Sequence, residues 1–275
     1  MSLRINTNMA SINAQRHLSV QNKRSTHAMK ALASGSRITS AADDAAGLAI
    51  SENLKSQNRS NRVAKRNAED AVSFIQVGEG SLNEINNILV RLRELGVQSA
   101  SDTIGDTERG FIDKEAQQLL SEVDRIAEST RFGDKQLLNG SMDELEFQVG
   151  IDGSDNSVIR YNSQADATAG ALNIDGLSFD DKSGARDALD VVDTAINQVG
   201  SMRASFGALQ NRLDSTVANL DTQHESLAAA NSRIRDADIA AESAEFTSAQ
   251  ILQQASIGML AQANQSKTAA LSLLG

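Results

Sequence analysis

The sequence predicts a mainly α-helical protein: an elongated antiparallel helical bundle or coiled coil, with a small β-hairpin region at mid-chain and paired N- and C-terminal helices. Three observations predict this fold. The 275 residues contain no proline, the usual helix breaker. Aromatic residues make up only 3% of the chain, so thin layers of Leu, Ile, Val and Ala are expected in place of a bulky core. Apolar residues also recur in steps of three and four, the spacing of one helix face.

Three apolar stripes define the helices of the middle section, residues 43–235, which we expect to form a helical bundle rod. Their steps average about 3.5 residues, the period of a coiled coil. The stripes are Ile75, Gly78, Leu82, Ile85, Leu89, Leu92 and Gly96; Ile112, Ala116, Leu119, Val123 and Ile126; and Leu189, Val192, Ile196, Val199, Met202, Phe206, Leu209, Leu213, Val217, Leu220 and Leu227. A capping-box pattern at Ser81 and Glu84 leaves open a helix start inside the first stripe.

Between the second and third stripes the period changes to two. Leu145, Phe147, Val149 and Ile151 alternate with polar residues, residues 153–156 are turn formers, and 158–161 read as the returning strand. Residues 172–179 repeat the alternation more weakly. We therefore expect a small β-region at about 132–180.

The two arms, residues 1–42 and 236–275, have thinner and Ala-rich apolar stripes. Their larger apolar residues include Ile5, Met9, Ile12, Phe246, Leu252, Leu260, Leu271 and Leu274. Such faces bury too little apolar area to offset a backbone ordering cost of about 1–2 kcal/mol per residue. We expect the arms to fray in the monomer and to fold on assembly, with these residues forming the polymerisation contacts.

Charge divides unevenly along the chain. The net charge of −10 argues against a general nucleic-acid binder. Residues 1–67 nevertheless carry eleven Lys or Arg against three acidic residues, whereas 236–275 carry four acidic residues against Lys267 alone. The basic N-terminal arm and the acidic C-terminal arm suit each other, within one chain or between copies.

No segment reads as a secretory signal or a membrane span. The N-terminus lacks the charged head and continuous apolar run of a signal peptide. Residues 246–266 are uncharged, but ten of these 21 residues are Gln, Asn, Ser or Thr, each costly in hydrocarbon. This segment is expected to be a partner-seeking helix.

Catalytic and metal-binding patterns do not emerge from the sequence, and we expect neither an enzyme nor a bound metal or cofactor. The chain has no cysteine, and its three histidines lie apart from any ligand cluster. Asp43 and Asp44 are adjacent, so their side chains point apart, and a capping or inter-subunit contact is expected. The basic run Lys55, Arg59, Arg62, Lys65 and Arg66 has helical spacing but no interleaved aromatics, which favours a solvated or subunit-facing helix over a phosphate-binding one.

Both ends of the chain closely resemble bacterial flagellin. The N-terminal part reads RINTNMASINAQRHL and then LASGSRITSAADDAAGLAISENLKSQ. The C-terminal part reads NSRIRDADIAAESAEFTSAQILQQASIGMLAQANQSKTAALSLL, and the segment LNEINNILVRLRELGVQSA is similar to the same family. The resemblance covers about residues 1–140 and 185–275, and it implies a short form without large outer domains.

The resemblance implies a structural subunit of the flagellar filament that drives swimming motility. Residues 1–42 and 236–275 would be the two halves of the filament-core helical domain. The subunit would be exported unfolded through the flagellar type III channel to an extracellular filament. Its implied partners are other copies of itself, an export chaperone on the C-terminal arm, the flagellar cap and junction proteins, and a Toll-like innate receptor.

The receptor motif of the family matches Arg91, Leu95 and Glu115 of this sequence. Arg91 and Leu95 are one helical turn apart, so they are expected to present one face, with Glu115 on the next helix. The alternative role for these residues is packing between neighbouring subunits.

Two other functions are compatible with parts of the sequence. A hook–filament junction protein shares its terminal helices with flagellin. A soluble coiled-coil adaptor would explain the heptad spacing, but it would not explain the uncharged, Ala- and Gln-rich arms.

Overall fold

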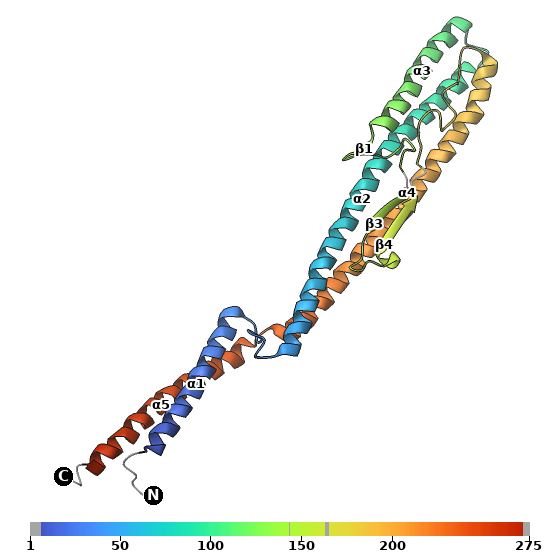
Figure 1. Cartoon of the computed structure of the whole chain (residues 1–275). Coiled ribbons are helices and arrows are strands. Elements are labelled where there is room, and N and C mark those ends of the chain that lie inside the picture. The colour runs from blue at the N-terminus through green and yellow to red at the C-terminus, as the bar shows by residue number, and fades with distance from the viewer. Residues whose placement is uncertain (1–6, 143, 163–164, 272–275) are drawn as a thin grey trace. The chain divides into compact units, whose positions relative to one another are not determined.

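The computed structural model describes residues 7–142, 144–162 and 165–271. In these residues it contains five α-helices: α1 (Met9–Ser34), α2 (Ala45–Ser99), α3 (Asp106–Ser129), α4 (Lys182–Arg235) and α5 (Ile239–Leu271). The chain divides into two units (Figure 1). The terminal unit comprises residues 1–58 and 225–275, and the central unit comprises 59–224. The helical class and the contact between the N- and C-terminal helices are confirmed.

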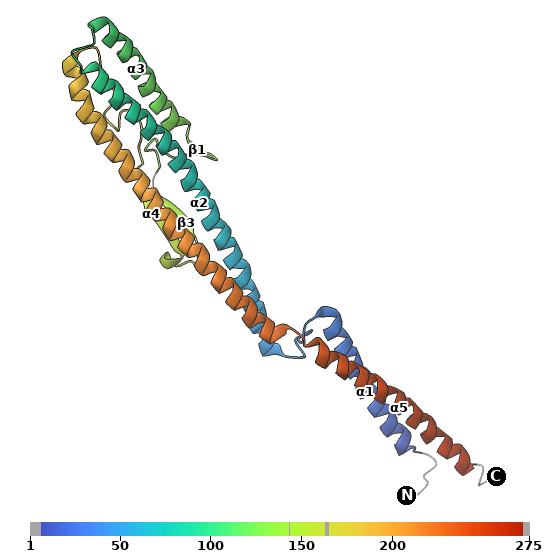
Figure 2. The ribbon, with the colours of Figure 1, turned by 180° about the vertical axis from the view of Figure 1, so that it is seen from behind.

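In the terminal unit, α1 and α5 lie side by side, as both views show (Figures 1 and 2). The side chain of Asn8 joins them: its Oδ1 accepts the amide hydrogen of Ser11 at the start of α1, and its Nδ2 donates to the carbonyl oxygen of Ala263 on α5 at 3.0 Å. Burial is slight, as the arms' composition predicts. The described residues of α1 and α5 that are buried are Ala28, Ala31 and Ala249.

Two loops close the terminal unit where α1 meets α2 and where α4 meets α5. Gly35 ends α1 with a φ of 66°, a left-handed conformation that suits glycine. The backbone N–H of Arg37 then donates to the carbonyl oxygen of Arg235 at 2.7 Å, and the N–H of Ala237 donates to that of Gly35 at 3.0 Å. The expected domain boundaries, 42/43 and 235/236, fall at these loops, whereas the two units divide within α2 and α4.

In the central unit, α3 and α4 pack against α2, and the three predicted apolar stripes supply the core. Ile75, Leu82, Ile85, Leu89 and Leu92 of α2 are all buried. They pack with residues that include Ile112, Ala116 and Val123 of α3 and Val192, Val199, Phe206 and Leu213 of α4. The alternative of a helix start at Ser81 does not occur, and α2 runs unbroken through this position, as the resemblance to flagellin implies. The hydroxyl of Ser81 instead donates to the carbonyl oxygen of Val77, one turn earlier.

Glycines on the α2 stripe allow the helices to approach closely. A Cβ added to Gly78 would lie 2.8 Å from Cε2 of Phe206 on α4, and one added to Gly96 would lie 2.9 Å from Cδ2 of Leu189. Both distances are shorter than ordinary van der Waals contact. The stripe therefore needs the absence of a side chain at these two positions.

The β-region consists of two short antiparallel pairs. One pair is β1 (Arg131–Phe132) with β2 (Lys135–Gln136), and the other is β3 (Glu144–Gln148) with β4 (Val158–Asn162). In the second pair Phe147 lies opposite Ile159, which confirms the predicted hairpin. A short 3₁₀ turn, η1 (Asp155–Ser157), lies in its loop.

The weaker period-two segment, residues 172–179, is not a strand. The N–H groups of Leu172 and Ile174 donate to the carbonyl oxygens of Thr168 and Ala169 in the same loop, and the backbone of Phe179 bonds to side chains of α2 and α3. The N–H of Phe179 donates to Asp113 Oδ1 at 2.9 Å, and the carbonyl oxygen of Phe179 accepts the Ser99 hydroxyl at 2.7 Å. Leu172 and Ile174 are buried, so the alternation in the sequence reflects a loop with inward-facing side chains.

A buried arginine secures the end of α2. Arg109, on α3, is 8% exposed, and its Nε donates to the carbonyl oxygen of Ser99 at 2.9 Å. Its Nη2 reaches the carbonyl oxygen of Ser101, also at 2.9 Å, and its Nη1 pairs with Asp106. Arg109 thus satisfies carbonyl groups that the end of a helix leaves without partners.

We predict that Arg109→Leu lowers the free energy of unfolding by about 2 kcal/mol or more, because it leaves these carbonyl groups without a charged donor. Arg125→Leu is the matched control, since Arg125 is an exposed arginine of α3 with a similar ion pair, to Glu122 three residues earlier. The control should leave stability nearly unchanged. Urea unfolding followed by circular dichroism measures both, and equal midpoints for the two variants would contradict the capping role.

Candidate functional site

Large apolar side chains are exposed along the terminal helices. Met9 and Ile12 on α1 and Leu252 on α5, all predicted assembly residues, are exposed, whereas Phe246 and Leu260 are half-buried. Leu271 is the last residue of α5, and Ile5 and Leu274 lie outside the described residues. The structure adds residues that the sequence analysis missed: Val20, Met29, Ile239, Ile251, Ile257 and Met259. The sequence could have identified them as exposed, because they are large apolar residues that lie off the thin stripes.

A groove of about 660 Å³ runs between α1 and α5. Small residues form much of its walls, among them Ala10, Ala14 and Ala263. Leu252 and Met259 also line it, and the Met259 residue is 70% exposed. A groove walled by alanines beside projecting Met and Leu side chains has the shape to accept an apolar helix face.

The opposite charges of the two arms are not neutralised by each other. In the described part of the chain no ion pair joins α1 to α5. The polar contacts of the terminal unit link other elements, such as His27 with Asp43 and Arg235, by an ion pair, with Glu52. Of the two arrangements that the sequence allowed, pairing within the chain is therefore absent among these residues.

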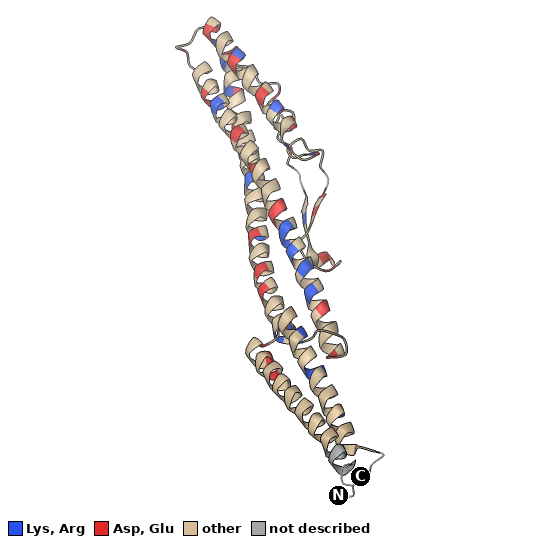
Figure 3. Cartoon of the chain, turned by 90° about the vertical axis from the view of Figure 1, so that its left-hand side faces the viewer, with Lys and Arg blue, Asp and Glu red and all other residues tan. Residues whose placement is uncertain are grey.

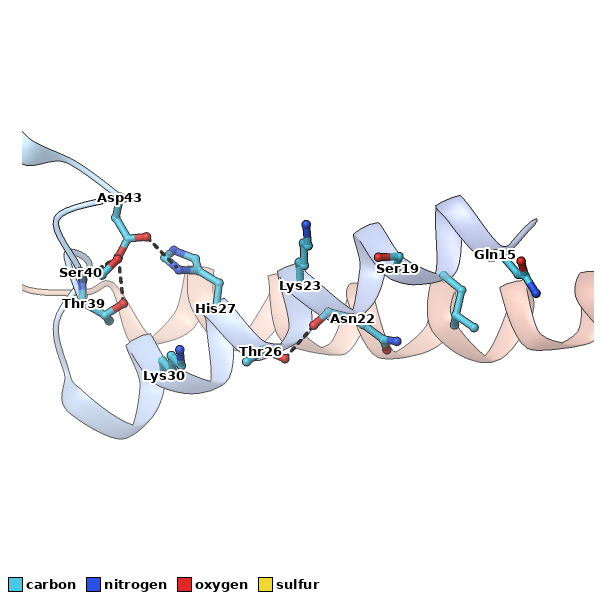
Figure 4. Close-up of a pocket in the computed structure, with 11 residues that line it drawn as sticks. Gln15, Ser19, Asn22, Lys23, Thr26, His27, Lys30, Thr39, Ser40 and Asp43 are labelled. Atoms are coloured by element: carbon cyan, nitrogen blue, oxygen red, sulfur yellow. Dashed lines mark hydrogen bonds and ion pairs between the residues drawn. The ribbon is translucent and has the colours of Figure 1, made fainter. Parts of the chain in front are cut away.

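A second groove, of about 520 Å³, lies between α1 and the loop that follows it (Figure 4). Lys23 and Lys30 line it, and Nδ1 of His27 lies 3.6 Å from Oδ1 of Asp43. The carboxylate of Asp43 accepts the hydroxyl and the N–H of Thr39 and the N–H of Ser40. These hydrogen bonds, that of the Thr39 hydroxyl first, lower the pKa of Asp43 to about 2.

The adjacent acids therefore shape the backbone, as predicted. Asp43 holds the loop, and Asp44 Oδ1 accepts the N–H of Gly47 at 2.8 Å in the first turn of α2. Across residues 7–142, 144–162 and 165–271, no group of three His, Cys, Asp or Glu could hold a metal ion. Within the same ranges, no helix is long and apolar enough to span a bilayer.

The three receptor-motif residues do not share one exposed face. Arg91 and Glu115 do: Nε and Nη2 of Arg91 donate to Glu115 Oε1 at 3.0 and 2.8 Å, across α2 and α3, and both side chains are about half exposed. The hydrogen bonds to Glu115, and then to Glu94, raise the pKa of Arg91. Leu95, by contrast, is 1% exposed and belongs to the core.

The expectation that Leu95 presents one face with Arg91 is therefore wrong. Leu95 follows Leu92 by three residues and precedes Gly96, so it lies at the edge of the buried stripe of α2. That spacing was visible in the sequence. The side chain turns inward because burial of a leucine stabilises the fold by about 1.5–3 kcal/mol.

Comparisons with known proteins match the same family along most of the chain. The bacterial flagellin N-terminal helical region matches residues 5–143, and the bacterial flagellin C-terminal helical region matches 189–274. Flagellin of Halalkalibacterium halodurans is 42% identical over 271 residues, covering 98% of this chain and 99% of its own. Flagellin of Bacillus subtilis is 41% identical over 99% of this chain and 100% of its own.

The fold comparison agrees with the sequence comparison. The crystal structure of Bacillus cereus flagellin is similar with a TM-score of 0.51 and 31% identity. The likeness covers 60% of this chain and 94% of that one.

We predict that Leu95→Ala lowers the free energy of unfolding by about 2–5 kcal/mol, because it leaves a cavity in the core. Arg91→Ala should change stability little, since the exposed ion pair with Glu115 is well solvated. Thermal and urea unfolding of the two variants measures the difference. Equal stability of both would contradict the inward placement of Leu95.

Proposed function

The chain belongs to the bacterial flagellin family, and from this premise we propose that it self-assembles into the flagellar filament through the exposed surface of α1 and α5. Members of this family are structural subunits of the filament. The observation that carries the proposal is the run of exposed apolar side chains on two helices that bury little of their own surface. A monomer that displays such a surface has an interaction site there.

Assembly would complete the burial that one copy leaves unfinished. Burying a large apolar side chain contributes about 1.5–3 kcal/mol, so a few of these residues together supply the driving force that the arms lack alone. Exposed apolar residues that do not line the groove, such as Met29 and Ile257, form a different patch, so the groove of one copy can accept this patch of another head to tail and the contact repeats into an open helical polymer. Ordering of the arms on assembly stays a prediction.

We propose the same route and partners that the family resemblance implies. The chain would travel unfolded through the flagellar export channel, and the absence of cysteine supports this, because no disulfide could cross-link it. A cytoplasmic chaperone would cover the apolar residues of α5 before export. Cap and junction proteins would bind at the ends of an extracellular filament.

A second proposal is recognition by a Toll-like innate receptor through Arg91 and Glu115. Their exposure on adjoining helices supports it, because a half-exposed guanidinium offers forked hydrogen bonds to a partner. In this proposal Leu95 acts indirectly, by holding α2 in place.

The assembly proposal predicts that Leu252→Glu combined with Met259→Glu abolishes filament growth. Both residues are exposed, so the monomer should keep its helix content, whereas burying two carboxylates at an interface is costly. Electron microscopy and sedimentation of concentrated protein provide the measurement. Ala171→Glu, at an exposed loop position of the central unit, is the control that should still polymerise. Filaments from the double variant at the concentration needed by the parent would refute the proposed surface.

The receptor proposal predicts that Arg91→Ala weakens signalling by the monomer at least about tenfold, as loss of a hot-spot arginine would. Leu95→Ala should weaken signalling only in parallel with its loss of folded protein. Dose–response curves, corrected for the folded fraction from circular dichroism, separate the two effects. A folded Arg91→Ala monomer with parental potency would argue against the receptor role.

A further inference from the structure

Three arginines of the central unit form an exposed stripe on α2. Arg59, Arg62 and Arg66 recur at intervals of three and four, so they lie on one face of the helix, and all three are exposed. The buried residues of this stretch, Asn61, Ala64 and Ala68, lie on the opposite side of the helix. Figure 3 shows Lys and Arg gathered along this stretch.

None of these three arginines has an ion-pair partner among the residues that the structure describes. The neighbouring Lys65 does, since its Nζ lies 2.6 Å from Asp221 Oδ1 on α4 and 3.7 Å from Glu69 Oε1. The sequence run of five cations therefore separates into groups with different roles. Lys65 ties α2 to α4 within the chain, whereas the arginine stripe points away from that contact.

An acidic stripe runs along α4. Asp214 and Asp221 are seven residues apart, hence on one face, and both are exposed. Asp214 has no ion-pair partner among the described residues. Both carboxylate oxygens of Asp221 accept hydrogen bonds from Lys65 Nζ, at 2.6 and 2.9 Å, but 54% of the side chain stays exposed, so a second cation can approach it from the solvent side. Figure 3 shows acidic residues on the helix beside the basic stretch.

We infer that the arginine stripe of α2 docks on the acidic stripe of α4 of a second copy of this chain. The inference rests on the proposed function, because it names the contact that places central units side by side in the polymer. Opposite charge supports it, and so does the fact that the three arginines and Asp214 have no ion-pair partner among the described residues of their own chain, although Asp221 is paired with Lys65. A solvated cationic stripe without such a partner would repel its neighbours in a dense polymer.

The spacing of the two stripes fixes a register. Within one chain α2 and α4 are antiparallel, since Lys65 pairs with Asp221 and Arg93 with Asp193. All copies in a helical polymer point the same way, so α2 of one copy also meets α4 of the next in antiparallel orientation. Arg59 and Arg66 are seven residues apart, about 10.5 Å along a helix, as are Asp214 and Asp221. Arg66 then lies opposite Asp214 of the second copy, and Arg59 opposite Asp221.

Charge reversal on the two stripes tests the pairing. Arg59→Glu with Arg66→Glu makes both stripes acidic, and Asp214→Arg with Asp221→Arg makes both basic. Each double variant alone should need at least about a tenfold higher concentration than the parent to polymerise at low salt. An equimolar mixture should polymerise within about threefold of the parental concentration, because each acidic stripe then meets a basic one. Salt should narrow all of these differences.

The controls separate this contact from net charge and from assembly itself. Lys114→Glu with Arg125→Glu replaces two exposed cations of α3, so it changes the net charge by the same amount as the double arginine variant. It should polymerise like the parent. An equal defect in this control, or parental behaviour of either stripe variant alone, would overturn the pairing while the filament function stands. A parent chain that forms no filaments would instead contradict the proposed function, and the pairing with it.

Cysteine cross-linking checks the register without relying on charge. Because the chain has no cysteine, Arg66→Cys copies and Asp214→Cys copies carry one thiol each and cannot bridge internally. Mixed filaments treated with a mild oxidant should give covalent dimers, and filaments of either variant alone should give far fewer. The absence of dimers from mixed filaments would overturn the proposed register.

Discussion

Burial of one apolar stripe of α2 against α3 and α4 holds the central unit together, and the positions of its functional side chains depend on it. Gly78 and Gly96 let neighbouring side chains approach α2 to within ordinary contact. Once this stripe faces inward, the flanks of α2 are set as well. Arg91 is brought to Glu115 of α3, and Arg93 is brought to Asp193 of α4.

The terminal unit follows the same helical periodicity with a different outcome. The buried residues described in α1 and α5 are alanines, which occupy little volume, so the two helices can lie close together while their larger apolar residues stay outside. The central unit buries its large apolar residues within one chain, whereas the terminal unit leaves many of its own exposed. This difference explains how one chain combines a self-contained bundle with an exposed apolar surface, the surface through which we propose that copies assemble.

Charge distribution follows from the same two arrangements. Helix α1 carries four basic residues and no acidic one, and α5 carries Glu242 and Glu245 against Lys267, yet the described residues of α1 and α5 form no ion pair with each other. On α2 and α4, Lys65 and Asp221 join the helices while Arg59, Arg62 and Arg66 stay outside. The buried stripe of each helix fixes how the helix is turned about its own axis. That orientation decides which charged side chains meet, because side chains three or four residues apart share a face and adjacent ones do not.

The sequence by itself determined the helices, the hairpin and the exposed character of the arms. These features depend on local spacing: steps of three and four for a helix, alternation for a strand, and alanine in place of leucine for a thin face. For the adjacent acids Asp43 and Asp44 it left a capping contact and an inter-subunit contact open, and the structure shows hydrogen bonds of the capping kind. For Leu95 the helical spacing from Arg91 predicted a shared exposed face, and the structure instead buries Leu95 beside the stripe that contains Leu92 and Gly96.

Only the tertiary structure decided how residues distant in sequence satisfy one another. The segment 172–179 has the alternation of a strand, but the backbone N–H and carbonyl oxygen of Phe179 bond to the side chains of Asp113 and Ser99 and not to a neighbouring strand. No sequence pattern singled out Arg109, yet its guanidinium donates to the carbonyl oxygens of Ser99 and Ser101 at the end of α2. Such hydrogen bonds join elements brought together by packing, and a buried donor or acceptor takes whichever partner the packing supplies. Local periodicity in the sequence therefore cannot predict these partners.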